Sequence, residues 1–387
     1  MKNITYLTDH KSIAKNIIIA IGSFLLGFGV RYAIFYIDFD TETTIEWNGG
    51  KYTGEVTDGQ PDGEGTFVRD NITYSGTWAN GNTFNGTVTS DKYIYEGDVV
   101  DLKFNGFGVC RYKEGSIYWG YWKDDNKEGI GKLRNVDGSI DFGIFKNGAI
   151  TKKETPFFNA GDQVYGIDVS HHQGIIKWQD LYFETDKFGN VHKRNSGKEY
   201  MRPVLFAFAK STEGATIKDD LYTLNRVEAR KSGIMFGAYH FYSMTSSAKD
   251  QAENFISNTT LETGDFPPVL DLEKIEYRRK ISDDEFRPVV ESAKEWLKIV
   301  ENHYGARPVI YTTVNVYKKF IANDIFFCNY DLWIANPGSI KPNIPNCILW
   351  QFSHKWLING IDSYVDTNCF IGDYKSLVDY IQQKGIK

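Results

Sequence analysis

The sequence has few cysteines and no run of basic residues, and both absences narrow the range of functions. Its four cysteines, Cys110, Cys328, Cys347 and Cys369, form no C-x-x-C pair, so a zinc site or a dithiol redox motif has no support. Three of them lie in the last third of the chain, where a disulfide and buried free thiols are both open interpretations. The net charge of the 387-residue chain is −6, and without a basic patch a nucleic-acid partner is not expected.

One almost entirely apolar segment, NIIIAIGSFLLGFGVRYAIFYI, runs from Asn16 to Ile37. It is long enough to cross a bilayer as a helix. Lysines precede it and acidic residues follow it, so the positive-inside tendency predicts a cytoplasmic N-terminus at residues 1–16, a transmembrane signal anchor at 17–37 and an extracytoplasmic location for the rest. A cleaved signal peptide is the alternative, which the lack of a small-x-small cleavage site disfavours.

A repeat occupies residues 50–150. The segments YTGEV, YSGTW, YEGDV, YWGYW and DFGIF recur at intervals of 21 to 23 residues, and a second element such as DGEGTF, NGFGVC or EGIGKL follows most of them. Alternating aromatic and polar residues that end in Gly, Asn or Asp turns predict β-hairpins, which stack to bury a face that none could bury alone. The pattern resembles MORN repeats, and the resemblance implies a spacer, or a docking platform for a protein or lipid partner.

The composition changes after a linker at residues 151–163. From residue 164 to 387, short apolar runs alternate with amphipathic segments that carry helix caps, about eight times in succession. This alternation predicts an α/β fold, a closed (β/α) barrel similar to the TIM barrel. Helical patterns are clear after the early strands and thin after the later ones, so the ring of helices should be incomplete. A segment containing KFGNVH between the first two strands indicates a surface hairpin.

The predicted strand ends bring acids and aromatic residues together, because barrel enzymes place reactive residues at the carboxyl ends of their strands. A rim of carboxylates with Tyr and Trp, and with no His/Cys cluster that would hold a metal, suits a glycan cleft. Glycoside hydrolysis needs one protonated carboxyl and one negative group, and crowded carboxylates supply both. The candidates in chain order are Asp168, Glu213, Tyr239, His240, Asp271, Glu273, Tyr311, Trp333, Trp350, Gln351 and Asp366.

The D-L-E stretch at Asp271 to Glu273 is the central feature of this set. In an extended strand, positions i and i+2 point to the same face, so the two carboxyls would lie side by side and push their pKa values apart. The alternative is that they are the solvated end of a strand. Asp168 could likewise be a structural acid, Asp366 could fix a loop, and Glu213 could be structural.

The aromatic and histidine candidates also have a second interpretation. Tyr239, Trp333 and Trp350 could serve as core residues rather than as platforms for sugars. His240, like His171 and His172, could be a hydrogen-bonded wall residue rather than a catalyst.

The segment from about Tyr165 to the C-terminus resembles glycoside hydrolase family 25, the lysozymes that act as N-acetylmuramidases. The motifs GIDVSHHQG, FAFAKSTEG, GAYHFY, QAENF, PPVLDLE, LWIAN, WQFS and VDTNCFIG carry the resemblance and occur in order. It implies that Glu273 is the general acid and that Asp271 stabilises charge or orients the substrate acetamido group, with Asp168 and Asp366 completing the acidic cluster. The chain departs from the family at His172, where an aromatic residue is common, and at Ser211, where alanine is usual.

These observations predict a membrane-anchored peptidoglycan hydrolase that cuts the β-1,4 bond between N-acetylmuramic acid and N-acetylglucosamine. No metal or other cofactor is implied. A chitinase-like glycosidase is a second hypothesis, although FPPVL before the D-x-E pair lacks the further acids usual there. A non-catalytic wall-binding scaffold that acts through its MORN repeats is the third.

Overall fold

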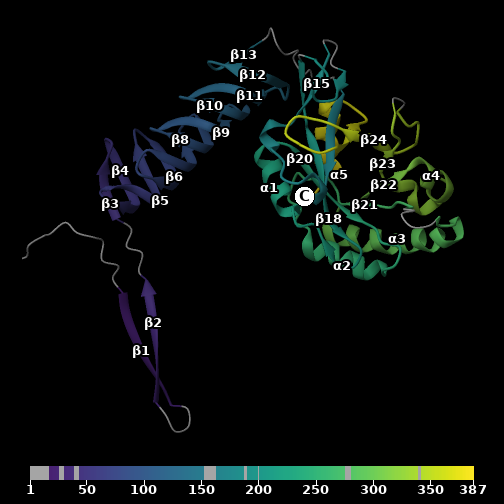
Figure 1. Ribbon diagram of the computed structural model, residues 1–387, viewed down its shortest axis with the longest axis horizontal. Helices are drawn as coiled ribbons and strands as arrows, with labels where there is room; N and C mark the ends of the chain where they lie inside the picture. The colour runs from purple at the N-terminus through teal and green to yellow at the C-terminus, as the bar shows by residue number, and fades with distance from the viewer. Residues whose placement is uncertain are drawn as a thin grey trace, which may run out of the picture.

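The computed structural model consists of an elongated β-sheet joined to a rounded β-barrel domain (Figure 1). Strands β3 to β13 form the extended sheet, and the chain from β14 onward forms the barrel and the helices around it. The structure describes residues 43–151, 163–186, 190–198, 200–274, 280–338 and 341–387, together with the backbone of 17–25 and 30–38.

The N-terminal segment differs from the transmembrane helix predicted at residues 17–37. Its described residues form two antiparallel strands, β1 (Ile17–Leu25) and β2 (Val30–Asp38). Isoleucine is β-branched and favours extended backbone, and glycine is a poor helix former, so propensity here competes with the helical interpretation. Within the described part of the chain, no helix has the length and apolar character needed to span a membrane. Residues 1–16 lie outside the described residues.

The repeat region is one eleven-stranded antiparallel sheet in which each strand pairs with the next along the chain. We call it the array. Hairpin turns at Asn and Asp residues with positive φ connect many of its strands, as the repeat pattern predicts. Its strands are β3 (Thr43–Trp47), β4 (Gly50–Thr57), β5 (Gln60–Arg69), β6 (Ile72–Ala79), β7 (Thr83–Thr89), β8 (Tyr93–Val100), β9 (Lys103–Tyr112), β10 (Ile117–Lys123), β11 (Asn126–Arg134), β12 (Ile140–Lys146) and β13 (Ala149–Ile150).

A row of glycines across the sheet makes room for the buried tyrosines of the repeat. The rings of Tyr52, Tyr95 and Tyr118 lie over glycines of the neighbouring strand, where any β-carbon would overlap the ring. All three tyrosines are fully buried in the aromatic core of the array. The row crosses the sheet with one residue from each strand between β4 and β12: Gly54, Gly65, Gly76, Gly86, Gly97, Gly108, Gly120, Gly131 and Gly143.

The second domain contains a closed eight-stranded barrel, because β14 pairs with β25 on one side and with β18 on the other. Seven strands are parallel, and β25 is antiparallel to both of its neighbours. The strands are β14 (Val164–Val169), β18 (Phe206–Glu213), β20 (Met235–Phe241), β21 (Val269–Asp271), β22 (Val309–Thr313), β23 (Leu332–Ala335), β24 (Cys347–Trp356) and β25 (Val365–Phe370); the short β19 (Ile217–Lys218) pairs antiparallel with the end of β18.

The helices form only part of a ring, so the barrel is not a TIM barrel with a helix after every strand. An antiparallel connection such as β24 to β25 needs only a short loop and no crossover helix. The cap signals located two of the helices well: Ser247 and Ser282 accept hydrogen bonds from backbone N–H groups at the helix starts, and Gly305 ends the second helix in the left-handed conformation. The helices are α1 (Tyr222–Lys231), α2 (Ala248–Asn258), α3 (Asp283–Tyr304), α4 (Val314–Val316) and α5 (Tyr374–Lys384), with shorter helical turns at His171–Gln173, Trp178–Asp180, Tyr317–Ile321 and Ile325–Asn329.

The predicted surface hairpin is present between the first two barrel strands. It is a small antiparallel sheet of β15 (Tyr182–Thr185), β16 (Val191–His192) and β17 (Tyr200–Pro203). The indole N–H of Trp356 donates to the carbonyl of His192 at 3.2 Å, which connects the insertion to the end of β24. All four cysteines are free in the structure, and Cys328 alone among them is exposed.

The array contacts the barrel at the end where the parallel strands begin. The ammonium of Lys132 is buried and donates to the carbonyls of Ser232, at 3.3 Å, and Gly233, just before β20. Its Nζ also lies 5.0 Å from the ring centre of Trp119. Phe142 joins the hydrophobic cluster at the base of the barrel. The array therefore packs on the base of the barrel and leaves the opposite end, where the parallel strands terminate, uncovered.

Candidate active site

Four carboxyl groups meet at the mouth of the barrel. Asp168 comes from β14, Asp271 ends β21, Glu273 follows two residues later, and Asp366 is the second residue of β25. Asp168 and Asp366 are direct neighbours in the strand register, because β25 runs antiparallel and so presents its first residues at the mouth. All four line one cavity of about 240 Å³, and Tyr239 lines it with them. The structure thus brings together the four acids that the sequence predicts.

Asp168 is a buried acid held by two amides. Its Oδ2 accepts hydrogen bonds from Gln351 Nε2 at 2.9 Å and from Asn368 Nδ2 at 2.8 Å. Burial and the nearby Asp366 raise the pKa of Asp168 to about 8, although the two amide donors act in the opposite direction. Asp168 therefore keeps a proton far more readily than an ordinary aspartate.

Two aromatic residues orient these amides. The hydroxyl of Tyr311 donates to Gln351 Oε1 at 2.9 Å, and the indole N–H of Trp333 donates to Asn368 Oδ1 at 2.9 Å. Because each amide oxygen is occupied, each amide N–H₂ faces Asp168. Both rings line the cavity, but Trp333 is nearly fully buried and packs on another ring of the barrel core. Tyr311 and Trp333 are predicted substrate contacts. The structure shows that they also position Asp168, through the two amides that they orient.

The D-L-E pair occupies the centre of the cavity wall. Burial raises the pKa of Asp271 well above its usual range, and the charges of Glu273 and Asp168 raise it further. Burial also raises the pKa of Glu273, while His354 and Tyr311 lower it in part. The buried Oδ1 of Asp271 has no hydrogen-bond partner among the described residues. An uncompensated buried acceptor is costly, so any donor that reaches this oxygen would stabilise the site.

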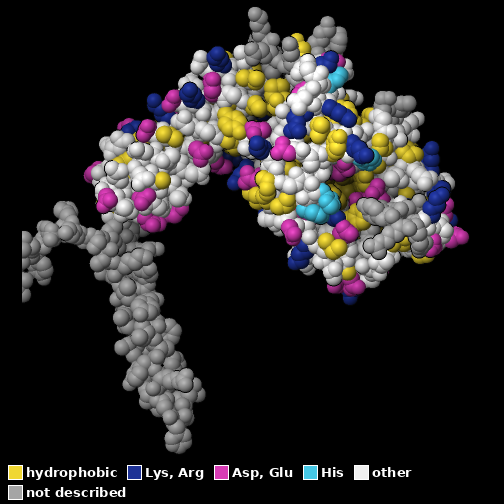
Figure 2. Space-filling view, viewed as in Figure 1, with side chains coloured by type: hydrophobic (Ala, Val, Ile, Leu, Met, Phe, Trp, Pro, Cys, Tyr) yellow, Lys and Arg dark blue, Asp and Glu magenta, His cyan; other side chains and the backbone are white. Residues whose placement is uncertain are grey.

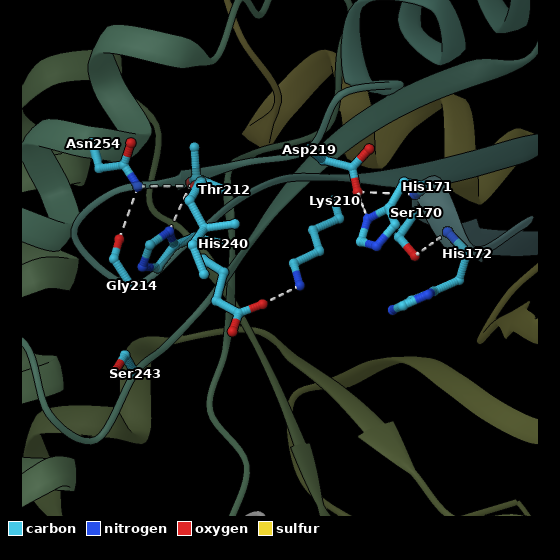
Figure 3. A network of polar contacts seen from close by, with 12 residues as sticks. Ser170, His171, His172, Lys210, Thr212, Gly214, Asp219, His240, Ser243 and Asn254 are labelled. Atoms are coloured by element: carbon cyan, nitrogen blue, oxygen red, sulfur yellow. Dashed lines mark hydrogen bonds and ion pairs between the residues drawn. The ribbon is translucent and has the colours of Figure 1, made fainter. Parts of the chain in front are cut away.

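Three further residues at the cavity carry charge or a titratable ring. The ammonium of Lys210, which is labelled in Figure 3, pairs with the Glu213 carboxylate. Both side chains line the cavity. Lys210 also lowers the pKa of Asp271 in part. His172 lines the same cavity beside Ser170. Lys210 was not predicted, although its place three residues before Glu213, on the same strand, is a usable signal.

His354 is the other residue that the sequence patterns missed. It lies near the end of β24, three residues after Gln351, and its Nδ1 is 3.8 Å from Asp366 Oδ2. Asp366 Oδ2 also faces Gln351 Nε2 at 3.4 Å. A histidine three residues after Gln351 and near the carboxyl end of a barrel strand is the signal that could have identified it.

Two predicted site residues neither line the cavity nor bond to its acids. His240 is fully buried, and its Nδ1 lies 2.7 Å from Thr212 Oγ1 (Figure 3). Its ring stacks on Trp296 of α3. Burial lowers its pKa to about 3, so it is a neutral wall residue. Trp350 donates its indole N–H to the carbonyl of Asn336 at 2.8 Å. Both are neighbours in sequence of residues that serve the site, and strand alternation turns such neighbours away from the barrel interior.

The described residues of the mouth offer no metal site. Among them, no group of three or more His, Cys, Asp or Glu side chains is placed to hold a metal ion. His171 is held by a single acid, with its Nδ1 2.8 Å from Asp219 Oδ2. The arrangement can bind a neutral polar polymer, donate a proton and stabilise positive charge, which are the operations of a glycoside hydrolase.

Comparison with known proteins agrees with this class. Residues 167–361 match the model of glycosyl hydrolases family 25, and residues 52–71, 95–117 and 118–140 match the MORN repeat. The uncharacterized protein YegX of Escherichia coli K12 is 34% identical over 226 residues, which cover 58% of this chain and 75% of YegX. Lysozyme M1 of Streptomyces globisporus is 29% identical over 228 residues, covering 56% of this chain and 70% of the lysozyme.

The bacterial lysozyme from Streptomyces coelicolor is a similar solved structure. It has 27% sequence identity and a TM-score of 0.46, and the alignment covers 58% of this chain and 99% of that one. The chain belongs to family 25 of the glycosyl hydrolases, since the family model spans half of it. It is a glycoside hydrolase whose catalytic domain follows an array of MORN repeats.

Proposed function

We propose that this protein is a lysozyme that hydrolyses peptidoglycan at the β-1,4 bond between N-acetylmuramic acid and N-acetylglucosamine. The convergence of four carboxyl groups at one barrel mouth carries this proposal. Family membership supports it, as do the relatives named Lysozyme M1 and, in Arthroderma benhamiae, N,O-diacetylmuramidase. The boundaries that we propose are 50–150 for the repeat array, 151–163 for the linker and 164–387 for the hydrolase domain.

Glu273 is the general acid in this proposal. A carboxyl that must donate a proton to the leaving oxygen has to retain it near neutral pH, and burial raises the pKa of Glu273 in that direction. His354 and Tyr311 limit the rise, so the group remains able to release its proton. This balance is what general acid catalysis requires, because a carboxyl with too high a pKa is a weak donor.

Asp271 orients the substrate acetamido group. Its buried Oδ1 lacks a donor among the described residues, and an acetamido N–H is a donor of suitable polarity. With its N–H held there, the acetamido oxygen can approach the anomeric carbon as the glycosidic bond breaks. Asp168 and Asp366 complete the acidic cluster, and the negative charge that the cluster retains stabilises the developing cation. Because the four acids crowd together, they share protons rather than ionise independently.

The test is a comparison of the protein from about residue 40 onward with its Glu273→Gln variant on purified peptidoglycan. The expected result is that new reducing ends are muramic acid and that the variant releases none. Glu253→Gln is the matched control, because Glu253 is exposed on α2 and pairs with Lys249 at 3.8 Å, away from the mouth. Equal release by Glu273→Gln and the unmodified protein would reject the assigned role, and no release by either across pH and wall types would reject the activity.

An extracytoplasmic location is proposed with this activity, since peptidoglycan lies outside the cytoplasm. Membrane attachment through residues 17–37 is supported by hydropathy alone, because the described backbone there is extended. The array serves as a spacer for the hydrolase domain or as a docking platform, as its sequence predicts. Contact of the array with the barrel base supports the spacer role, because it leaves the mouth unobstructed.

A further inference from the structure

We propose that His354 is a positioning residue of this active site, a cation that pairs with Asp366 and balances the four acids at the barrel mouth. The proposal rests on the proposed function and adds a role that the general acid and its three neighbouring acids do not supply. Its first support is geometric: His354 Nδ1 lies 3.8 Å from Asp366 Oδ2, from the adjacent strand β24.

The same Asp366 oxygen is approached from two sides. Gln351 Nε2 lies 3.4 Å from Oδ2 and His354 approaches it as well, while Tyr311 orients the Gln351 amide. A third of the Asp366 side chain is accessible, and water alone would not fix its rotamer. The imidazole therefore restricts the carboxylate that borders Asp168 across the β14–β25 register.

The charge balance of the mouth gives the second support. The charged groups that raise the pKa of His354 are Asp366 on β25, Asp168 on β14 and Glu273 beyond β21, and all three are acids. Lys210, a cation that lines the cavity, is already paired with Glu213. Asp366 is the largest cause that raises the pKa of His354 above its usual value, and His354 in turn lowers the pKa of Glu273.

The direction of the effect on catalysis follows from the role of Glu273. Activity is lost as the pH rises through the pKa of the general acid, which sets the basic limb of the pH profile. Removing the positive charge of His354 raises the pKa of Glu273 further, so the basic limb moves to higher pH. A half-exposed pair of this kind produces a shift of about half a pH unit. The same change lowers kcat, because Glu273 becomes a weaker donor and Asp366 is less restricted.

The experiment measures pH profiles of kcat and KM on soluble peptidoglycan fragments for His354→Gln and His354→Lys. His303→Gln, an exposed histidine on α3 away from the mouth, is the matched control. We expect a basic limb shifted upward and a kcat reduced about threefold to tenfold in His354→Gln, as for one lost polar interaction. His354→Lys, which keeps the charge, should restore the position of the limb. Profiles of His354→Gln that match His303→Gln, or no rescue by lysine, would overturn the proposal.

A second readout does not depend on activity. In a nuclear magnetic resonance titration of histidine-labelled protein, the His354 signal, assigned from its loss in His354→Gln, should titrate above about 6.5, the usual pKa of histidine. Asp366→Asn should lower that pKa, and Glu253→Gln should leave it unchanged. If the protein is inactive but Asp366→Asn still lowers the pKa of His354, the proposed function is rejected and the His354–Asp366 pair is retained. If the protein is active and Asp366→Asn leaves that pKa unchanged, the pair is rejected.

Discussion

Gly233 is the residue at which the joint between the array and the barrel can be tested most sharply. Its φ is +64°, a left-handed conformation, and a β-carbon there would overlap the indole ring of Trp119 on the array. Alanine at this position costs about 1 kcal/mol for the backbone conformation and about 1–3 kcal/mol for the overlap. We therefore expect Gly233→Ala to lose roughly 2–4 kcal/mol of unfolding free energy. Urea denaturation followed by tryptophan fluorescence measures this loss.

The control is Gly197→Ala. Gly197 also has a left-handed φ of +75°, but no heavy atom lies within 4 Å of the position that a β-carbon would take there, so only the backbone cost of about 1 kcal/mol should remain. In a protein that already carries Trp119→Ala, Gly233→Ala should cost only the backbone term, because the overlap with the indole ring is gone. Equal losses in Gly233→Ala and Gly197→Ala would refute the reasoning, because they would mean that Trp119 does not pack against Gly233 in solution. The kcat of folded Gly233→Ala should be unchanged, since Gly233 is at the base of the barrel.

Three further predictions concern the site and the joint. Trp333→Phe removes the N–H that orients Asn368, and kcat should fall about threefold to tenfold with KM nearly unchanged in steady-state assays. If Asp271 orients the acetamido group as an internal nucleophile, the first product should keep the β configuration, and a nuclear magnetic resonance time course that shows the α-anomer first would exclude this route. Burial lowers the pKa of Lys132 to about 7, so the unfolded state binds more protons above that pH and unfolding free energy should rise by about 2 kcal/mol between pH 7 and 9. Lys132→Met should abolish this rise in urea titrations at the two pH values, and a rise of the same size in the variant would contradict the assignment.

The local sequence pattern predicted helices and strands well where residue propensity, capping residues and burial all favour the same structure. The helix α3 begins after Ser282 and ends before Gly305, as its cap residues indicate. The N-terminal apolar segment shows the opposite case. Length and hydropathy indicate a membrane helix, but isoleucine-rich sequence is equally suited to strands, and no local signal decides between them. The antiparallel direction of β25 could not be predicted from its sequence either. Strand direction depends on the length and path of the connection between strands rather than on the residues of the strand itself.

The acids of the site were predictable because strand ends converge at a barrel mouth, whereas their partners depend on side-chain direction. Asp168 and Asp271 are read directly from the residues that end apolar runs. His240, beside Tyr239, has the right place along the chain but faces Thr212 and α2 instead of the cavity. His354 lies past irregular pairing between β24 and β25, where the two-residue alternation of a strand no longer predicts the face. Sequence reasoning therefore located the four acids of the barrel mouth and missed Lys210 and His354 beside them.

The side chains on the outward face of the array differ between its two ends, and this explains why the barrel packs against one end only. A single cross-strand row changes from hydroxyl to apolar character along the sheet, and hydrophobic side chains are visible on the strands nearest the barrel (Figure 2). At the far end the hydroxyls bond to one another, as Thr66 and Ser75 do at 2.7 Å, and gain nothing by burial against an apolar surface. At the near end Trp119 and Phe142 pack on the barrel base, with Lys132 between them bonded to backbone carbonyls. The row is Thr44, Thr53, Thr66, Ser75, Thr87, Glu96, Val109, Trp119, Lys132 and Phe142. Because this row packs on the base of the barrel, the mouth points away from the array. The repeats can therefore extend the molecule without covering the site where a glycan strand would bind.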